Sequence, residues 1–120
     1  MIFRKSEATE TSATDAKGGS GTMTGLSYVS RGGRPGGSRL IMAAVNSLAP
    51  GASIGVHPHD SDEEVYIILA GSGEYTDSDG KASKVEAGDF TLARQGESHG
   101  LRNTGAEPLT FAAVIVADRN

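Results

Sequence analysis

Hydrophobic and polar residues alternate along this chain in short runs, and most of these runs begin after residue 25. Residues 6–20 contain no large apolar side chain, so this stretch predicts a solvated arm with no face to bury. From residue 26 onward, β-branched and aliphatic residues recur in runs spaced by roughly ten residues. No segment keeps apolar residues at a helical period over three turns, which argues against a long amphipathic helix.

Turn-forming dipeptides separate the apolar runs. Asp79-Gly80 is typical of a two-residue type I′ hairpin, because both central positions of that turn favour positive φ. The pattern predicts strands over residues 26–30, 39–48, 53–59, 64–70, 73–76, 83–86, 90–94, 98–103 and 109–117. Many short strands at this spacing indicate an all-β sandwich or barrel. We therefore expect a polar N-terminal arm over residues 1–25, which could exchange a strand with a neighbouring subunit, and a β-barrel domain over residues 26–120.

Composition narrows the possible partners. A chain of 120 residues fits one domain, and its 17 glycines follow no Gly-x-y repeat, which excludes collagen. Eleven basic residues are scattered against fifteen acidic ones, so no basic stripe for nucleic acid is present. The apolar runs are too short for a membrane helix. The absence of cysteine excludes disulfides and thiolate sites, and with no apolar signal segment we expect a cytoplasmic protein.

The three histidines are the main candidates for chemistry. His57 and His59 are two residues apart in a predicted strand, so their imidazoles point to the same side. Glu64 begins the next predicted strand after a short turn, and His99 lies on a later one. Three imidazoles and one carboxylate that converge inside a barrel would hold one divalent transition metal per chain. This donor set suits Fe(II), Mn(II), Ni(II), Co(II) or Zn(II) and does not choose among them.

The spacing of these residues resembles the first motif of the cupin superfamily. The chain has Gly51-x5-His57-x-His59-x4-Glu64-x6-Gly71, and five fixed positions in register are far more specific than a typical short motif.

The second cupin motif is also recognisable. The chain has Gly88-x5-Arg94-x-Gly96-x2-His99-x3-Asn103, with Arg94 where the family usually has proline. The resemblance to small single-domain metal cupins implies a double-stranded β-helix, or jelly-roll, barrel. It also implies a homodimer that packs outer sheet faces. We interpret Asn103 and the motif glycines as structural residues that form turns.

Strand parity predicts the wall of the metal cavity. Tyr66 and Ile68 share a face with Glu64, while Leu101 and Asn103 share one with His99. Gly55 and Ser53 share a face with His57. For the strand over residues 39–48, either of two sets could face inward. The two sets are Arg39, Ile41, Ala43 and Val45, or Leu40, Met42 and Ala44.

Two further side chains are candidates for roles in catalysis or substrate binding. The hydroxyl of Tyr66 could orient a bound water or a substrate oxygen beside the metal. The guanidinium of Arg94 could bind a substrate carboxylate, with a solvated loop arginine as the alternative. Asp60, Asp62 and Glu63 form an acidic turn before Glu64, which we interpret as solvated.

Other kinds of active site lack support in the sequence. There is no Gly-x-Ser-x-Gly elbow for a serine hydrolase, and the glycine-rich segment over residues 32–37 lacks the Gly-Lys-Ser/Thr ending of a phosphate loop. The resemblance implies metal-centred Lewis-acid chemistry on a small oxygenated molecule, such as a carboxylate, dicarbonyl, enediol or sugar-like compound, by a dioxygenase, decarboxylase or isomerase. The alternative is a non-catalytic module that binds or senses a small carboxylate such as oxalate.

Overall fold

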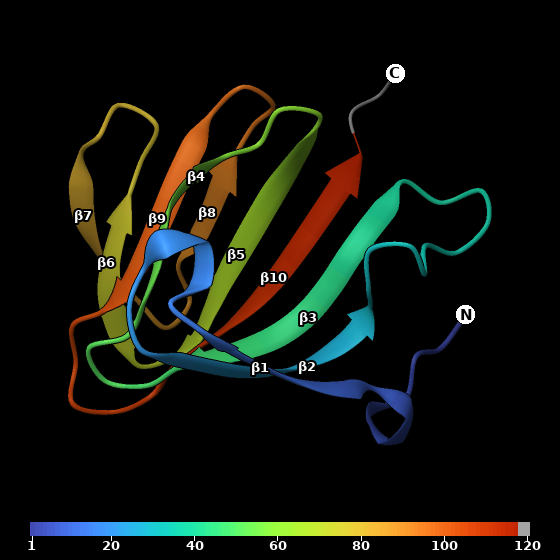
Figure 1. Ribbon diagram of the computed structural model, residues 1–120, viewed down its shortest axis with the longest axis horizontal. Helices are drawn as coiled ribbons and strands as arrows, with labels where there is room; N and C mark the ends of the chain where they lie inside the picture. Colours follow the sequence, from blue (N-terminus) through green and yellow to red (C-terminus); the bar gives the residue numbers. More distant parts are fainter. Residues whose placement is uncertain (118–120) are drawn as a thin grey trace.

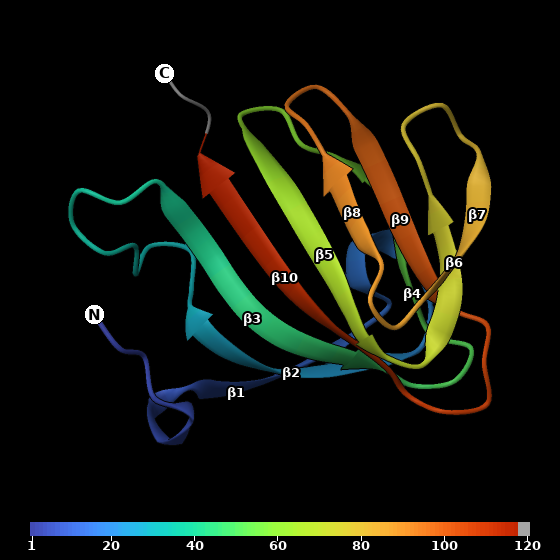
Figure 2. The ribbon, with the colours of Figure 1, turned by 180° about the vertical axis from the view of Figure 1, so that it is seen from behind.

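The computed structural model describes residues 1–117 as two facing antiparallel sheets (Figures 1 and 2). Its strands are β1 (Thr9–Thr14), β2 (Thr22–Val29), β3 (Leu40–Leu48), β4 (Ser53–Pro58), β5 (Asp62–Ala70), β6 (Ser72–Thr76), β7 (Ala82–Glu86), β8 (Phe90–Ala93), β9 (Ser98–Asn103) and β10 (Leu109–Ala117). Two short 3₁₀ turns, η1 (Lys5–Glu7) and η2 (Ala16–Gly18), flank β1. Each predicted strand is present within about four residues of its expected bounds.

The two sheets have different sizes. The larger one has the order β1-β2-β3-β10-β5-β8, and the smaller one has the order β4-β9-β6-β7. The sheets face each other across the interior, with β5 and β4 on opposite walls (Figure 2). This architecture confirms the expected all-β class. No helix within residues 1–117 is long and apolar enough to cross a membrane.

The core follows from the alternation of side chains along the strands. On β10, Leu109, Phe111 and Ala113 are almost completely buried, and the residues between them are only half-buried. On β5, Tyr66 and Ile68 are buried in the same way. A period of two places these side chains between the sheets, where they form one apolar cluster. This cluster supports the strands that carry the candidate site.

Asn103 fixes the turn that follows β9. Its side-chain nitrogen donates hydrogen bonds to the carbonyls of Leu48 and Glu107 at 2.9 and 2.8 Å, and its oxygen accepts one from the Gly105 amide at 2.9 Å. The side chain is 1% exposed. Because buried polar groups need partners, these bonds explain why an amide occupies this position. The interpretation of Asn103 as a structural residue is confirmed.

The N-terminal region differs from the solvated arm expected for residues 6–20. β1 pairs with β2 along its whole length and becomes the edge strand of the larger sheet. Its side chains stay largely exposed, which is why the apolar pattern gave no sign of a strand. The backbone hydrogen bonds of the ladder, rather than buried side chains, hold this segment.

The turn between β6 and β7 also differs from the expected hairpin. Gly80 has a φ of 81°, but Asp79 does not lie in the left-handed region, so the turn is not type I′. Asp77 instead closes a three-residue loop, since its amide donates to the Lys81 carbonyl at 2.9 Å and its carbonyl accepts from Gly80 at 2.9 Å. A type I turn followed by one left-handed glycine is the usual form of such a loop.

Candidate metal centre

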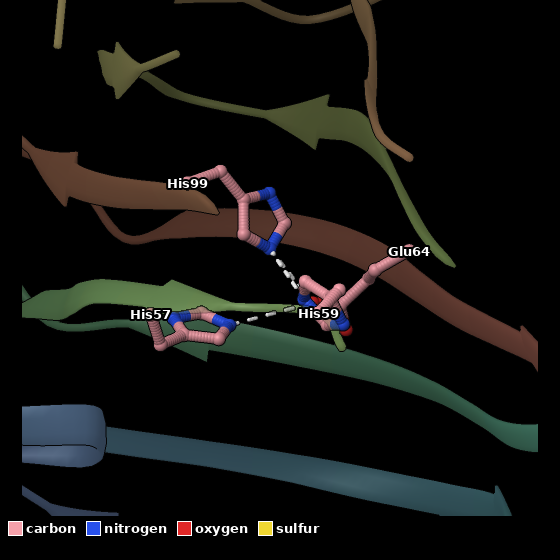
Figure 3. Close-up of side chains that lie close together, drawn as sticks. All are labelled: His57, His59, Glu64 and His99. Carbon is pink, nitrogen blue, oxygen red and sulfur yellow. Dashed lines mark hydrogen bonds and ion pairs between the residues drawn. The ribbon is translucent and has the colours of Figure 1, made fainter. Parts of the chain in front are cut away.

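Four side chains converge between the two sheets. His57 lies near the end of β4, His59 follows that strand directly, Glu64 lies on β5 and His99 lies on β9. The antiparallel pairing of β4 with β9 places His57 opposite His99. Figure 3 shows the three imidazoles and the carboxylate pointing toward one another. One donor atom from each of the four lies within 4.8 Å of the others, so the group could hold a metal ion.

Glu64 lies at the centre of this group. Its Oε1 atom is 3.0 Å from Nε2 of His99, 3.2 Å from Nε2 of His59 and 3.7 Å from Nε2 of His57. The Nε2 atoms of His59 and His99 are 3.0 Å apart. All three imidazoles therefore present the same ring nitrogen to one carboxylate oxygen.

The outer nitrogens of the first two imidazoles have fixed partners. Nδ1 of His57 lies 2.7 Å from the Gly55 carbonyl oxygen, and Nδ1 of His59 lies 2.6 Å from Oδ1 of Asp62. A carbonyl and a carboxylate accept hydrogen bonds, so each Nδ1 carries the hydrogen. Asp62 is buried and also accepts a hydrogen bond from Arg31 at 3.2 Å. These contacts orient both rings and leave their Nε2 lone pairs free to face Glu64.

The Nδ1 atom of His99 also has a hydrogen-bond partner. Its Nδ1 lies 2.9 Å from the hydroxyl of Tyr75, on the neighbouring strand β6. Burial raises the pKa of Tyr75 to about 12, so the phenol stays neutral and its oxygen can accept the Nδ1 hydrogen. In that tautomer Nε2 of His99 also presents a lone pair. Three lone pairs and a carboxylate around one point form a donor set that fits a divalent cation.

The electrostatics of the group support an ionised Glu64. Burial opposes its ionisation, but Nε2 of His57, His59 and His99 donates to the carboxylate whenever a ring is protonated, and these contacts outweigh burial and hold the pKa of Glu64 well below the usual range. Glu64 accepts a hydrogen bond from the protonated ring of His59, and this bond, with a second one accepted by Asp62, raises the pKa of His59 against its burial. Burial is the larger effect at His99 and lowers its pKa, which favours the neutral ring. A neutral imidazole is the form that binds a metal.

A cavity of about 650 Å³ opens beside this group. Its wall includes Met42 and Asn46 of β3, which decides between the two faces left open for that strand. The set containing Leu40, Met42 and Ala44 faces inward. Asn46, on the same face, is 8% exposed, and no other side chain or backbone group of residues 1–117 hydrogen-bonds to its amide. The cavity, whose wall combines apolar with charged and polar side chains, therefore offers within residues 1–117 an amide that is free to bind a ligand.

The expectation for β4 is wrong. The pairing of β4 with β9 shifts register between Ile54 and His57, so the period of two is interrupted there. As a result Ile54 faces the cavity, whereas Gly55 and Ser53 do not line it. Ser53 instead exchanges backbone hydrogen bonds with Ser20.

The remaining wall residues divide into two groups. Tyr66 lines the cavity, as expected. Ile68, Leu101 and Asn103 face inward but lie in the core, outside the cavity wall. The alternation of side chains along a strand shows which residues face the interior. It does not show how far along the barrel each residue lies, and these three lie away from the cavity.

Tyr66 packs directly against the candidate ligands. Its ring stacks on that of His99, with centroids 4.7 Å apart and an interplanar angle of 15°. Burial, followed by the charge of Glu64, raises the pKa of Tyr66 well above its usual value, so the hydroxyl keeps its proton. A role for that hydroxyl toward a bound molecule remains a prediction.

Arg94 lies apart from the cavity wall. Its side chain is 72% exposed and forms two hydrogen bonds with Glu97, at 3.0 and 3.1 Å. These bonds, with a further one from the Arg94 amide, hold the pKa of Glu97 at about 2. The structure thus places Arg94 in the solvated loop setting that was the alternative to a substrate contact.

Asp62 and Tyr75 are the site residues that the sequence interpretation missed. Asp62 was interpreted as part of a solvated acidic turn, although its spacing of two from Glu64 already favours the inner face of β5. Tyr75 carries no comparable signal, because only the pairing of β6 with β9 brings it to His99.

Replacing Tyr75 by phenylalanine is expected to lower metal affinity by about 10- to 100-fold, because His99 then loses the acceptor that fixes its tautomer. The measurement is competition for the metal with a chromogenic chelator. Tyr28→Phe is the matched control, because no hydrogen bond ties its hydroxyl to another residue within 1–117. Equal affinities for the Tyr75→Phe variant and the wild type would show that Tyr75 does not orient His99.

The fold and the donor set together define a β-barrel protein with a candidate metal-binding group. The sequence model of the Cupin domain matches residues 44–116, and the chain belongs to the cupin family. A protein of Thermotoga maritima described as an oxalate-binding protein is 37% identical over 116 residues, which are 97% of this chain and 93% of that one.

Solved structures agree with this assignment. The crystal structure of a predicted oxalate decarboxylase from Thermotoga maritima has a TM-score of 0.87 at 35% identity and covers 98% of this chain and 100% of that one. The polyketide cyclase RemF from Streptomyces resistomycificus has a TM-score of 0.73 at 18% identity over 98% of this chain and 80% of that one, a likeness of fold alone. These similarities confirm the expected double-stranded β-helix.

Proposed function

We propose that this cupin binds one divalent metal ion through His57, His59, Glu64 and His99 and uses it to hold a small dicarboxylate of the oxalate class. One observation carries the proposal. Each imidazole has its Nδ1 committed to a partner, so three Nε2 lone pairs and one carboxylate meet beside a cavity large enough for a small molecule. The similarity to an oxalate-binding protein supports this ligand class.

The metal would supply Lewis acidity, which polarises the oxygens of a carboxylate that chelates it. Fe, Mn, Ni, Co and Zn all remain compatible with the donor set. The chain's own residues orient the ligands and shape the site. Tyr66 can donate a hydrogen bond to a ligand oxygen because its hydroxyl stays protonated, and Ile54 and Met42 limit the access of water along the wall.

Turnover of the bound molecule is the second candidate, and Tyr66 is the observation that favours it. A protonated hydroxyl on the cavity wall is the kind of group that can deliver a proton to a reacting carboxylate. A decarboxylase would convert the monoanion of oxalic acid to formate and carbon dioxide. We give Arg94 no part in either function, because Glu97 already occupies its guanidinium.

Elemental analysis of protein purified without a histidine tag tests the metal, and an assay for formate, carbon dioxide and oxygen uptake tests turnover. We expect close to one transition metal ion per chain, and slow or no loss of oxalate. Rapid formate production would favour the decarboxylase over the binding protein. A metal content near zero that divalent ions fail to restore would contradict both.

We also propose a homodimer that buries the outer face of the larger sheet. One register row of that face runs Leu26, Val45, Ala112, Ile67 and Phe90 across five strands without a charged residue. Phe90 is 62% exposed and Ile67 is 37% exposed in the single chain. A contiguous apolar face of this kind is typical of an interface. Exchange of the N-terminal arm over residues 1–25 and the cytoplasmic location stay predictions.

Phe90→Glu is expected to convert a dimer into a monomer at micromolar concentration, because it places a charge at the most exposed apolar side chain of this row, on the edge strand β8. Sedimentation equilibrium measures the mass, and Ser83→Glu on the exposed strand β7 is the control for added charge. Wild-type protein that sediments as a monomer would rule out the proposed interface.

A further inference from the structure

A short loop outside the matched Cupin segment closes one side of the metal cavity. Residues 15–21 form this loop, which contains η2 and lies against β4 (Figure 1). Hydrogen bonds between Asp15 and Gly21 close it, at 2.9 Å between backbone groups and 3.0 Å to the Asp15 carboxylate. Ser20 and Ser53 then tie it to β4 by backbone hydrogen bonds of 2.7 and 3.3 Å.

The backbone of the loop packs directly against the backbone of β4. A Cβ atom on Gly55 would overlap the carbonyl oxygen of Lys17, and one on Gly19 would overlap the carbonyl oxygen of Ser53. Because both positions are glycine, the two backbones touch directly, two residues from His57. The position of Lys17 relative to the candidate metal centre is therefore set by backbone contacts.

Lys17 has an unusual backbone conformation. Its φ is 54°, and among residues 1–117 only Asp15 shares a positive φ without being glycine. The left-handed region disfavours residues with a Cβ, so glycine would suit this position better than lysine. Glycine does occupy the next two positions, Gly18 and Gly19, but not position 17. Non-glycine residues held in this region concentrate at functional sites. The conformation thus suggests that the lysine side chain itself is required here.

Lys17 also supplies an unpaired positive charge. It lines the cavity together with Arg31, but Arg31 is hydrogen-bonded to Asp62. No carboxylate within residues 1–117 pairs with Lys17. A dicarboxylate that chelates a divalent metal beside Glu64 would leave the site with excess negative charge. Lys17 belongs to the cavity lining and carries an ammonium on a flexible side chain, which would offset that charge.

We infer that Lys17 is a specificity-determining residue that pairs with a carboxylate of the bound dianion, so that the site prefers dicarboxylates to monocarboxylates. This inference rests on the proposed function. A flexible ammonium forms charge-assisted hydrogen bonds with carboxylate oxygens, and a partly solvated pair of this kind changes affinity by roughly 2- to 5-fold. Acetate carries one negative charge, which together with Glu64 already balances a divalent metal, so acetate gains little from Lys17.

Calorimetric titration of oxalate and acetate into full-length Mn(II)-loaded and Zn(II)-loaded protein tests the inference. Lys17→Gly is expected to weaken oxalate binding roughly 2- to 5-fold and to leave acetate binding unchanged within about 1.5-fold. Lys17→Arg should restore most of the oxalate affinity. Because glycine suits the left-handed conformation, Lys17→Gly should melt at the wild-type temperature or above it, with unchanged metal content.

Lys81→Gly is the matched control, since it removes an exposed loop lysine of the same charge. If the wild type binds oxalate and Lys17→Gly binds it equally well, or loses no more affinity than Lys81→Gly, the role of Lys17 is refuted and the proposed function stands. If the wild type binds oxalate with neither metal, the proposed function fails and the inference fails with it.

Discussion

His99→Ala is expected to lower metal affinity by more than about 100-fold, since it removes one of four donors and the Nε2 atom closest to Glu64. After dialysis against a metal-free buffer, the variant should retain almost no metal, whereas the wild type retains close to one equivalent. Elemental analysis of both proteins after the same dialysis gives the result directly. Loss of the metal should also remove the thermal stabilisation that it gives the wild type.

Since His99 is completely buried, alanine leaves a cavity, and a second variant is needed to separate metal loss from unfolding. Glu64→Gln keeps the volume and removes the central negative charge, so it should lose most metal affinity while the apoprotein keeps its β-sheet circular dichroism. Arg94→Ala, at an exposed loop position, is the control and should bind metal as the wild type does. Wild-type metal content in either His99→Ala or Glu64→Gln would contradict the ligand assignment.

Phe111→Ala is expected to reduce the free energy of unfolding by about 3–5 kcal/mol, the typical effect of truncating a fully buried aromatic side chain. Phe111 is 0% exposed and lies edge-on to Tyr66, with ring centroids 5.0 Å apart. Urea denaturation of the metal-free protein measures the change without a contribution from metal binding. The loss of this contact should also weaken metal binding, because Tyr66 stacks on His99.

The matched control is Phe3→Ala, at an N-terminal phenylalanine that is 47% exposed. Its effect should stay within about 0.5 kcal/mol, as for most surface substitutions. A loss below about 1 kcal/mol for Phe111→Ala would mean that the two sheets do not pack around this ring as the structure shows.

Much of the fold follows from local sequence patterns. The strand over residues 98–103 and the strand over residues 109–117 have the expected bounds, because alternation and turn residues act over short distances. β1 could not be predicted in this way, because its backbone pairs with β2 while its side chains remain in solvent. An edge strand that buries no apolar face has no hydrophobic period to detect.

In the candidate site, too, the residues that follow local patterns could be predicted, and those that depend on pairing between strands could not. His57, His59, Glu64 and His99 could be selected by motif spacing, and the structure brings all four together. The cavity wall could be predicted only where the strands keep a regular period, so the bulge that turns Ile54 inward was missed. Bulges depend on the pairing between strands and leave little trace in a single sequence.

The hardest residues to predict were those that contact a candidate metal-binding residue, or reach the cavity, from a distant part of the sequence. Tyr75 reaches His99 through the pairing of two strands, and Lys17 reaches the cavity through a loop that packs on Gly55. Both depend on contacts between segments far apart in the sequence. If the proposed role of Lys17 holds, the ligand class depends in part on a residue that lies outside the motifs.

Calorimetric titration of oxalate into one batch of protein, before and after removal of its metal with a chelator, tests the central claim most directly. The account predicts saturable binding of about one oxalate per chain before removal, no detectable binding after it, and recovery when the metal is restored. Equal binding by the metal-free and metal-loaded protein would contradict the claim that the metal holds the ligand. No binding by the metal-loaded protein would contradict the claim that this cupin recognises a small dicarboxylate.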